Sequence, residues 1–155
     1  MTIIDVSTGD RIQVNVMPVE NADYKFLTSQ RYFFNWKEEK GYEVYKLVIK
    51  DTNDILGLIS IERIPQEWRI HIRLLTVSTE NRGRAKKYER IAGNLIAHVA
   101  KIAVELFGEM ACISLKPKTT IRQHYIDTYN MKLTGKVLSL EVPELLNLIN
   151  QYDHE

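Results

Sequence analysis

A basic segment in the middle of the chain is the part of the sequence best suited to bind an anion. It carries one acid, Glu89, and five cationic side chains: Arg82, Arg84, Lys86, Lys87 and Arg90. The residues before it alternate in polarity, as in a half-buried strand, and those after it repeat apolar side chains at helical spacing. The first N–H groups of a helix lack acceptors within it, and the helix dipole favours a negative charge there. Because Gly83 also lets a ligand approach the backbone, the segment predicts a phosphate site at the start of a helix.

The other side chains that could do chemistry are isolated in the sequence. Cys112 is the only cysteine, which excludes an internal disulfide and a cysteine zinc cluster. Its apolar neighbours favour a small buried residue over a nucleophile. His98 and His124 fall on expected helices with no partner visible in sequence, so they receive no role. No metal site is predicted.

The composition is that of an ordinary globular protein. Of 155 residues, 45% are hydrophobic and 26% are charged, so we expect one domain covering residues 1–155. The net charge of +1 makes the basic segment a local feature, and only Tyr88 adds an aromatic ring to it. A nucleic-acid site is therefore the weaker alternative, beside a simple solvated loop.

The N-terminus and the apolar runs bear on where the protein works. Met1–Asp5 is too short and too acidic for a signal peptide. We also expect that no apolar run is long enough to span a membrane. We therefore expect a cytoplasmic protein with no membrane partner.

Strands and helices are expected on both sides of the basic segment. The expected strands cover residues 11–17, 45–49, 55–63, 68–77, 110–115 and 132–142. Short polar turns join the strands from 45 to 77 into an antiparallel meander. The expected helices run from a cap at Asn21 or Asp23 to 34, from about 91 to 107, from a cap at Thr119 or Thr120 to 129, and from Pro143 onward. Gly108 and Asn130 are expected to end two of them, and a helix between the strands at 68–77 and 110–115 implies a right-handed parallel crossover.

This order of elements, with an anion-binding segment after the fourth strand, resembles the GCN5-related N-acetyltransferase superfamily, best from Tyr45 to Gly135. The resemblance implies an α/β fold, a mixed and mostly antiparallel sheet flanked by helices. It also implies that acetyl-coenzyme A binds with its pyrophosphate on the N–H groups of the basic segment. Its pantetheine arm would pair with the strand end at Leu75, Thr76 and Val77 and enter where the strands from 68 and 110 splay.

The family writes the pyrophosphate loop as Q/R-x-x-G-x-G/A, and the chain fits this motif in two registers. Counted from the strand, Arg82-Gly83-Arg84-Ala85 stands at the family's distance, with Ala85 and Lys87 at the glycine positions. Counted from the helix, Lys87-Tyr88-Glu89-Arg90-Ile91-Ala92 fits, with Arg90 at the first glycine. We prefer the second register, because anion binding needs N–H groups at the helix start. Arg90 would either hinder the coenzyme or add a charge-assisted contact to a phosphate.

The resemblance assigns the coenzyme-binding residues accordingly. The preferred register gives the pyrophosphate to the backbone around Arg90 to Gly93, with Lys87 assisting, and Arg82 and Arg84 within reach of the 3′-phosphate. The full expected set is Leu75, Thr76, Val77, Arg82, Gly83, Lys87, Tyr88, Arg90, Ile91, Ala92 and Gly93.

A second stretch, 119–131, resembles the family's helix that carries a tyrosine before a glycine-aromatic turn. Tyr125 occupies that place, and Asn130-Met131 replaces the turn. The resemblance makes Tyr125 the general acid that protonates the leaving thiolate, and a half-buried core tyrosine is the alternative. The base is poorly marked. His71 has a suitable unperturbed pKa of roughly 6.5, yet the pattern favours an edge or surface histidine, and Glu62 is an equally weak candidate.

The sequence thus predicts an enzyme that moves an acetyl group from acetyl-coenzyme A to an amine by direct attack. The acceptor, a small molecule or a peptide, stays open. The aromatic residues from Tyr24 to Trp36 lie where the family builds its acceptor pocket, although most are expected in the core. The competing hypothesis is a non-catalytic module that keeps the fold for binding or dimerisation, because the glycine pattern is degenerate and a base is missing. The last strand and helix are a candidate homodimer surface.

Overall fold

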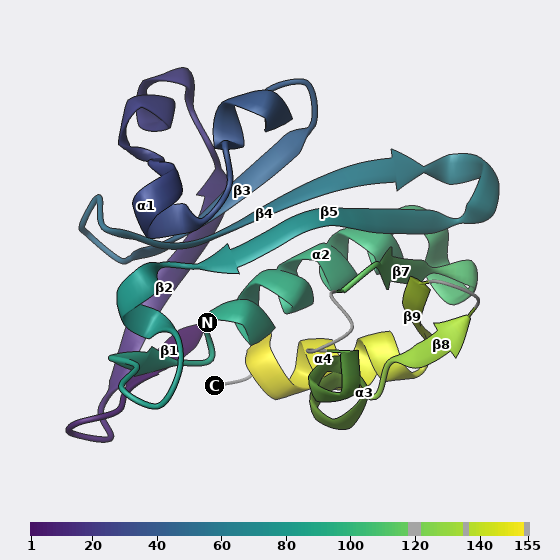
Figure 1. Ribbon diagram of the computed structural model, residues 1–155. Coiled ribbons are helices and arrows are strands. Elements are labelled where there is room, and N and C mark those ends of the chain that lie inside the picture. The colour runs from purple at the N-terminus through teal and green to yellow at the C-terminus, as the bar shows by residue number, and fades with distance from the viewer. Residues whose placement is uncertain (118–121, 135–136, 154–155) are drawn as a thin grey trace. The chain divides into compact units, whose positions relative to one another are not determined.

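The computed structural model describes residues 1–117, 122–134 and 137–153 (Figure 1). Its strands are β1 (Thr2–Asp5), β2 (Arg11–Pro18), β3 (Glu43–Ile49), β4 (Ile55–Ile64), β5 (Arg69–Val77), β6 (Tyr88–Glu89), β7 (Cys112–Leu115), β8 (Lys132–Thr134) and β9 (Val137–Glu141). Its α-helices are α1 (Ser29–Tyr32), α2 (Ile91–Phe107), α3 (Arg122–Tyr129) and α4 (Glu144–Asp153). Short 3₁₀ helices are η1 (Asn21–Phe26), η2 (Trp36–Glu39), η3 (Pro65–Glu67), η4 (Thr79–Asn81) and η5 (Gly108–Met110).

The chain divides into two compact units. Unit 1 contains Met1–Ser60 and Leu74–Ile96, and unit 2 contains Ile61–Arg73 and Ala97–His154. β4, β5 and α2 contribute residues to both units. The expected fold class, α/β with a mixed and mostly antiparallel sheet flanked by helices, is confirmed. A single domain over residues 1–155 stays a prediction.

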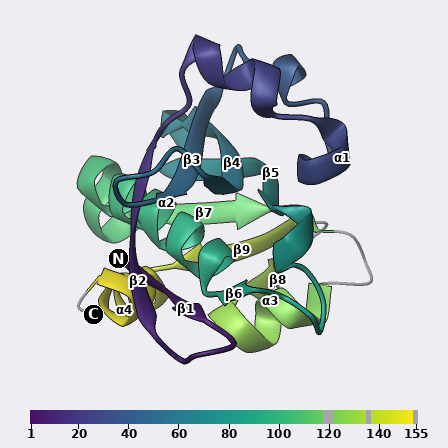
Figure 2. The same cartoon turned by 90° about the vertical axis from the view of Figure 1, so that its left-hand side faces the viewer.

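In unit 1 the strands follow the order β6-β1-β2-β3 and continue through β4 and β5. The pairs β1–β2, β2–β3 and β1–β6 are antiparallel, and β1 and β6 were not expected from the sequence. The segment from η1 through η2 packs on this sheet (Figure 2), with a core of Tyr24, Leu27, Tyr32, Trp36, Val44, Val48, Ile55 and Leu58. Of the six aromatic side chains from Tyr24 to Trp36, three lie in this core and Phe34 packs against it, whereas Phe26 and Phe33 are exposed.

The single helix expected over residues 21–34 is wrong. Two short elements, η1 and α1, take its place, because Thr28 starts a new helix by accepting the N–H of Arg31 at 3.3 Å. Asp23, expected as a cap, accepts the N–H of Glu20 at 2.8 Å instead. α1 ends at Phe33, whose φ of 71° places it in the left-handed region. The helix is interrupted here, and the rings on both sides of Thr28 pack on the same sheet. Tertiary packing therefore overrides helix propensity in this segment.

The first turn of α2 lies very close to β4 in unit 1. A Cβ atom on Gly57 would come within 2.7 Å of Ile91 Cγ2, 3.0 Å of Leu95 Cδ1 and 3.2 Å of the Thr76 carbonyl oxygen. Real Cβ atoms essentially never come as close as 2.7 Å to another heavy atom, so glycine permits this approach of Ile91. Gly57 therefore fixes how near the start of α2 comes to the sheet.

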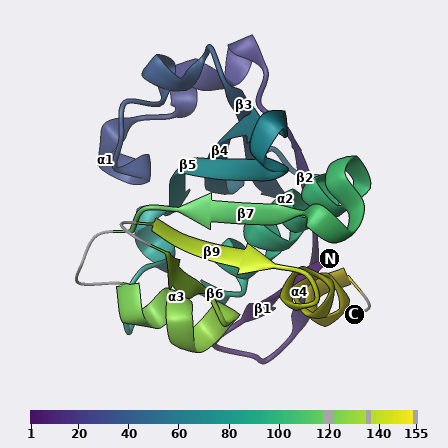
Figure 3. The same cartoon turned by 90° about the vertical axis from the view of Figure 1, so that its right-hand side faces the viewer.

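In unit 2 the strands follow the order β4-β5-β7-β9-β8. β5 and β7 are parallel, in register from Arg69↔Cys112 to Ile72↔Leu115, which confirms the expected crossover through α2. β7 pairs antiparallel with β9, and Figure 3 shows these two strands side by side. Gly108 and Asn130 follow α2 and α3 with φ angles of 56° and 61°, which confirms both helix stops.

The last strand expected over residues 132–142 is instead a hairpin. β8 and β9 pair antiparallel from Lys132↔Ser139 to Thr134↔Val137. The sequence carries a turn signal at Gly135, between the two halves of the expected strand. Residues 135–136 and the expected helix caps Thr119 and Thr120 lie outside the described residues. α4 starts at Glu144, directly after Pro143, as expected.

One described stretch, Ile91–Met110, is long and apolar enough to cross a membrane by length and composition alone. The expectation that no apolar run approaches this length is therefore wrong. Half of the stretch is buried inside the protein, and core helices pass the same test, so it is weak evidence for a span. The lack of a membrane partner stays a prediction.

Candidate functional site

The basic segment forms the loop between β5 and α2, within unit 1. It passes through η4, pairs with β1 as β6 and enters α2 at Ile91. The helix thus begins where the preferred register of the motif requires it. Arg90, at the family's first glycine, has a φ of 80°. This is the left-handed backbone conformation that glycine adopts without strain, so the glycine-like geometry is kept although the residue is arginine.

Only some of the backbone N–H groups in this loop are available to a ligand. Lys87 donates its N–H to the Glu80 carbonyl at 3.2 Å, and Tyr88 donates to Asn81 Oδ1 at 2.9 Å. The first bond within α2 runs from Asn94 N to the Arg90 carbonyl at 3.1 Å. The N–H groups of Ile91, Ala92 and Gly93 come before that bond and have no acceptor in the helix. An anion would meet these three groups and not those of Lys87 and Tyr88.

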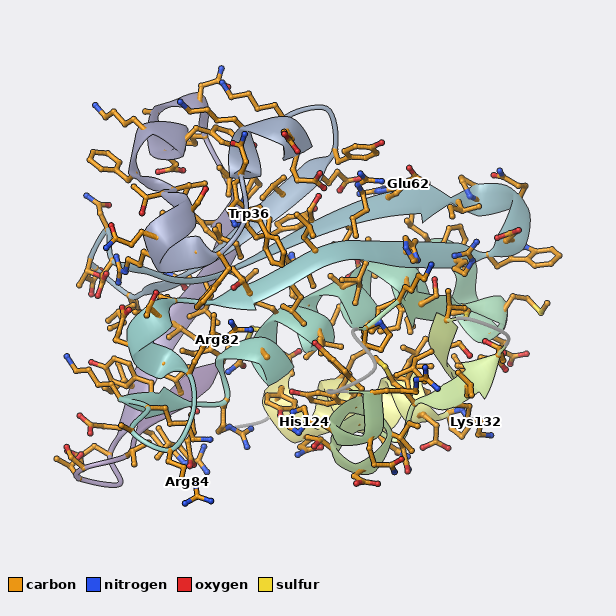
Figure 4. The ribbon with its side chains drawn as sticks, in the orientation of Figure 1. Trp36, Glu62, Arg82, Arg84, His124 and Lys132 are labelled. Atoms are coloured by element: carbon orange, nitrogen blue, oxygen red, sulfur yellow. The ribbon has the colours of Figure 1, made fainter. Side chains whose placement is uncertain are left out.

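The charged side chains of the loop are mostly exposed. The Arg82 guanidinium lies 3.9 Å from the centre of the Phe33 ring, a cation–π contact. Gly83 has a φ of 74° and open space where its Cβ would be. Arg84 is exposed on the same loop (Figure 4). Lys87 Nζ lies 5.3 Å from the centre of the Tyr88 ring. The loop therefore presents positive charge beside the start of α2.

The resemblance assigns the end of β5 to the pantetheine arm, which stays a prediction. Leu75 and Val77 are half-buried, and Thr76 is buried with its hydroxyl donating to the Val77 carbonyl at 3.1 Å. The described ladder between β5 and β7 stops at Ile72↔Leu115, while β5 continues to Val77. The ladder stops there because Leu115 is the last residue of β7.

Tyr125 lies on α3, in unit 2, and is half-buried. Its ring centre is 5.9 Å from that of Tyr129 and 5.8 Å from that of His124. Tyr125 thus belongs to a small group of rings on α3. That environment suits either a proton donor or a packed tyrosine.

His71 has a more specific environment than the sequence suggested. It lies on β5, between β4 and β7, so the expectation of an edge histidine is wrong. His71 Nδ1 is 2.9 Å from Ser114 Oγ, and Arg69 Nη1 donates to the same oxygen at 2.7 Å. Burial, and then the charge of Arg69, lower the pKa of His71 below its ordinary value of 6.5. The ring is therefore neutral at pH 7.

The structure adds little support for a functional role of Cys112 or Glu62. Cys112 is half-buried, and burial followed by the charge of Glu141 raises the pKa of its thiol, which agrees with a structural role. Glu62 is half-buried on β4, and its charge acts on His71. Among the described residues, no group of three His, Cys, Asp or Glu side chains could hold a metal ion.

Asn81 and Ser114 are the residues that sequence reasoning missed. Asn81 is buried and joins Ser78 Oγ, at 2.9 Å, to the backbone of Tyr88. Ser114 is 1% exposed and lies between His71 and Arg69. Asn81 follows a strand, which is a weak turn signal. Ser114 carries no signal, because its partners come from a strand more than forty positions earlier.

No protein-family model and no curated protein matches the sequence. Solved structures do match. Spermidine/spermine N-acetyltransferase SpeG from Vibrio cholerae has a TM-score of 0.63 at 13% identity, covering 87% of this chain and 96% of that chain. The ribosomal-protein-S18-alanine N-acetyltransferase from Escherichia coli has a TM-score of 0.62 at 8% identity, covering 84% and 94%. N-acetylglutamate synthase from Neisseria gonorrhoeae, complexed with coenzyme A and L-arginine, has a TM-score of 0.63 at 9% identity, covering 84% of this chain but 33% of that one.

Two of these similar structures are named as N-acetyltransferases, of spermidine/spermine and of a ribosomal-protein alanine, and the third is named as N-acetylglutamate synthase. The chain therefore has the fold of the GCN5-related N-acetyltransferase superfamily, and the resemblance noted in the sequence is confirmed at the level of fold.

Proposed function

We propose that the protein transfers an acetyl group from acetyl-coenzyme A to an amine. The observation that carries the proposal is the start of α2, where a glycine-like backbone at Arg90 leads into three N–H groups without acceptors in the helix. The fold it shares with acetyltransferases supports the same activity. The cytoplasmic location stays a prediction.

The residues present fit the coenzyme, with one change from the sequence assignment. The N–H groups of Ile91, Ala92 and Gly93 would hold the pyrophosphate, and Arg90 would add a charge-assisted contact. Lys87 and Tyr88 would contribute through their side chains, because their N–H groups donate within the protein. Arg82 and Arg84 would meet the 3′-phosphate. When bound, the coenzyme supplies a thioester whose carbonyl carbon the amine can attack directly.

Two side chains of unit 2 would handle protons. Tyr125 would give its hydroxyl proton to the departing thiolate. His71 would take the proton of the acceptor amine, because its lowered pKa leaves the ring neutral at pH 7. This role needs Nδ1–H to donate to Ser114 Oγ, which accepts from Arg69 as well, so that Nε2 keeps a lone pair. The raised pKa of the Cys112 thiol disfavours a thiolate nucleophile, which agrees with direct transfer and no acyl-enzyme.

Isothermal titration of acetyl-coenzyme A into the purified protein tests the proposal. Binding in the micromolar range, about −8 kcal/mol, supports it and justifies a screen of amine acceptors by thiol release. No heat and no rise in melting temperature at millimolar ligand would contradict it, since a ligand of the native state stabilises by mass action. The non-catalytic module would then be the better account.

A further inference from the structure

Arg31, on α1, forms ion pairs with two carboxylates of unit 1, Glu80 and Asp54. Its Nε and Nη2 atoms donate to Glu80 Oε1 at 3.2 and 2.5 Å, and Nη2 also donates to Asp54 Oδ1 at 3.1 Å. Hydrogen bonding to Glu80 raises the pKa of Arg31, so its charge is permanent. Glu80 belongs to η4, at the beginning of the basic loop, and Asp54 precedes β4.

Three further contacts join the same two segments. Thr79 Oγ1 donates to the carbonyl oxygens of Gln30 and Arg31, each at 3.0 Å. Arg82 stacks on Phe33 at 3.9 Å, at the end of α1. Three kinds of interaction, an ion pair, hydrogen bonds and a cation–π contact, therefore hold α1 against residues 79–82.

Backbone contacts carry this connection on toward α2. The carbonyl of Glu80 accepts the N–H of Lys87 at 3.2 Å, and the side chain of Asn81 accepts the N–H of Tyr88 at 2.9 Å. Lys87 and Tyr88 lead through Arg90 to Ile91, where α2 begins. A continuous series of bonds thus links the Arg31 side chain to the segment that sets the position of the helix start.

We infer that Arg31 is a positioning residue that couples α1 to the coenzyme-binding end of α2, through Glu80 and the loop at 79–88. The inference rests on the proposed function, because it treats the start of α2 as the coenzyme site. Arg31 itself need not touch the coenzyme. The ion pair is well exposed, with side-chain exposures of 36% and 39%, so it adds little to folding stability. Its effect should therefore be seen in coenzyme affinity and in the loop backbone.

The test is titration of acetyl-coenzyme A into Arg31→Ala, Glu80→Ala and the double variant. We expect each single variant to bind about five- to tenfold more weakly, the lower range of coupling between sites. The double variant should bind no more weakly than either single one, because both remove the same connection. Hydrogen exchange at the amides of Lys87 and Tyr88 should be faster in all three.

Lys46→Ala is the matched control. Lys46 forms an ion pair of 2.7 Å with Asp23, also in unit 1. The two side chains are only 12% and 18% exposed, so this pair is more buried than that of Arg31 and Glu80. It does not involve the loop, so coenzyme affinity and amide exchange at Lys87 and Tyr88 should stay at wild-type values. An equal loss of affinity in this control would show a general structural effect and overturn the inference.

The outcomes separate the inference from the proposed function. If the wild-type protein binds acetyl-coenzyme A and the Arg31 variants show the same affinity and the same amide exchange, the inference is overturned but the proposed function is not. Absence of acetyl-coenzyme A binding in the wild-type protein would overturn the proposed function, and the inference with it.

Discussion

Arg90 adopts a backbone conformation that its own side chain does not favour. A left-handed backbone costs a residue with a Cβ about 1–2 kcal/mol, and the family places glycine at this position. In return for this strain, Arg90 places a cation at the first turn of α2, beside N–H groups that already favour an anion. A single residue thus combines the geometry of the family's glycine with a charge that glycine lacks.

Replacing Arg90 by Gly separates these two contributions. We expect folding stability to be unchanged or raised by up to about 1 kcal/mol, because glycine relieves the strain but adds freedom to the unfolded chain. Acetyl-coenzyme A should bind about tenfold more weakly, since a charge-assisted hydrogen bond contributes about 1.5–3 kcal/mol. Calorimetric titration and thermal unfolding measure both. Arg84→Ala, which removes a charge from the same loop, should have a smaller effect, and tighter binding in Arg90→Gly would show that the arginine obstructs the site.

Tyr125→Phe tests the general acid. Turnover should fall about 10²- to 10⁴-fold, the usual contribution of general acid catalysis, while the affinity for acetyl-coenzyme A stays the same. Tyr129→Phe, on the same helix and in contact with the same ring, is the control and should keep its turnover. Unchanged turnover in Tyr125→Phe would rule out its role as acid.

His71 predicts the shape of the pH–rate profile. Its folded pKa lies below 6.5, so the base is already deprotonated at neutral pH. kcat/KM should therefore fall as pH decreases below 6.5 and show no further histidine step between pH 7 and 8, when measured with an acceptor found by the thiol-release screen. His71→Gln should remove this acid limb, and Ser114→Ala should shift it. If the acid limb of the profile persists in His71→Gln, it belongs to another titrating group and His71 is not the base.

At the scale of elements, the placement of α2 depends on a glycine, Gly57, which has no side chain. Gly57 lets Ile91 and Leu95 lie against β4, and these residues form the first turns of the helix proposed to hold the coenzyme. The position of a ligand site is thus set by how closely the helix packs on the sheet.

Gly57→Ala should be destabilising by about 1–3 kcal/mol, the usual cost of overpacking. The Cβ would meet Ile91, Leu95 and the backbone oxygen of Thr76, so the Ile91 and Leu95 side chains or the helix start would have to shift. Coenzyme affinity should fall as well. Gly41→Ala is the matched control, because nothing lies within 4 Å of its Cβ. Equal unfolding free energies for the two variants, from urea titration, would contradict the close approach.

At the scale of the whole molecule, two histidines and one glutamate shift their pKa values in the same direction. Burial lowers the pKa of His71 and His98 below 6.5. Burial is the largest single influence on Glu80 and would raise its pKa, but the hydrogen bond from Arg31, further hydrogen bonds and the charge of Arg31 together lower that pKa below 4.5. In each case the unfolded chain binds a proton that the folded chain binds less readily. The stability from these groups is therefore complete above pH 6.5 and is lost as the pH falls through their folded-state pKa values.

The melting temperature should consequently decrease between pH 6.5 and 5, and again below pH 4.5. A tenfold difference between the folded and unfolded acid dissociation constants of one group corresponds to about 1.4 kcal/mol. Each kcal/mol changes the melting temperature by about 2–4 °C for a chain of this size. Differential scanning calorimetry across pH 4 to 8 measures this. A flat melting temperature from pH 7 to 5 would contradict the histidine part, and the His98→Gln variant should flatten that region in part.

The sequence by itself determined the elements whose signals are local. The strands around 45–77, the body of α2, and the stops at Gly108 and Asn130 follow from polarity period and turn chemistry within a few residues. The start of α2 at Ile91 was also predictable, while the phosphate register that relies on it stays a prediction.

Only the tertiary structure decided the features that join distant parts of the chain. The helix over 21–34 broke because its rings share one sheet, and β6 formed because β1 lies beside it. The pairing of Arg31 with Glu80 spans 49 positions, and that of His71 with Ser114 spans 43. Such contacts carry no local signal, because their free energy appears only after the intervening chain has folded and its loop entropy is lost.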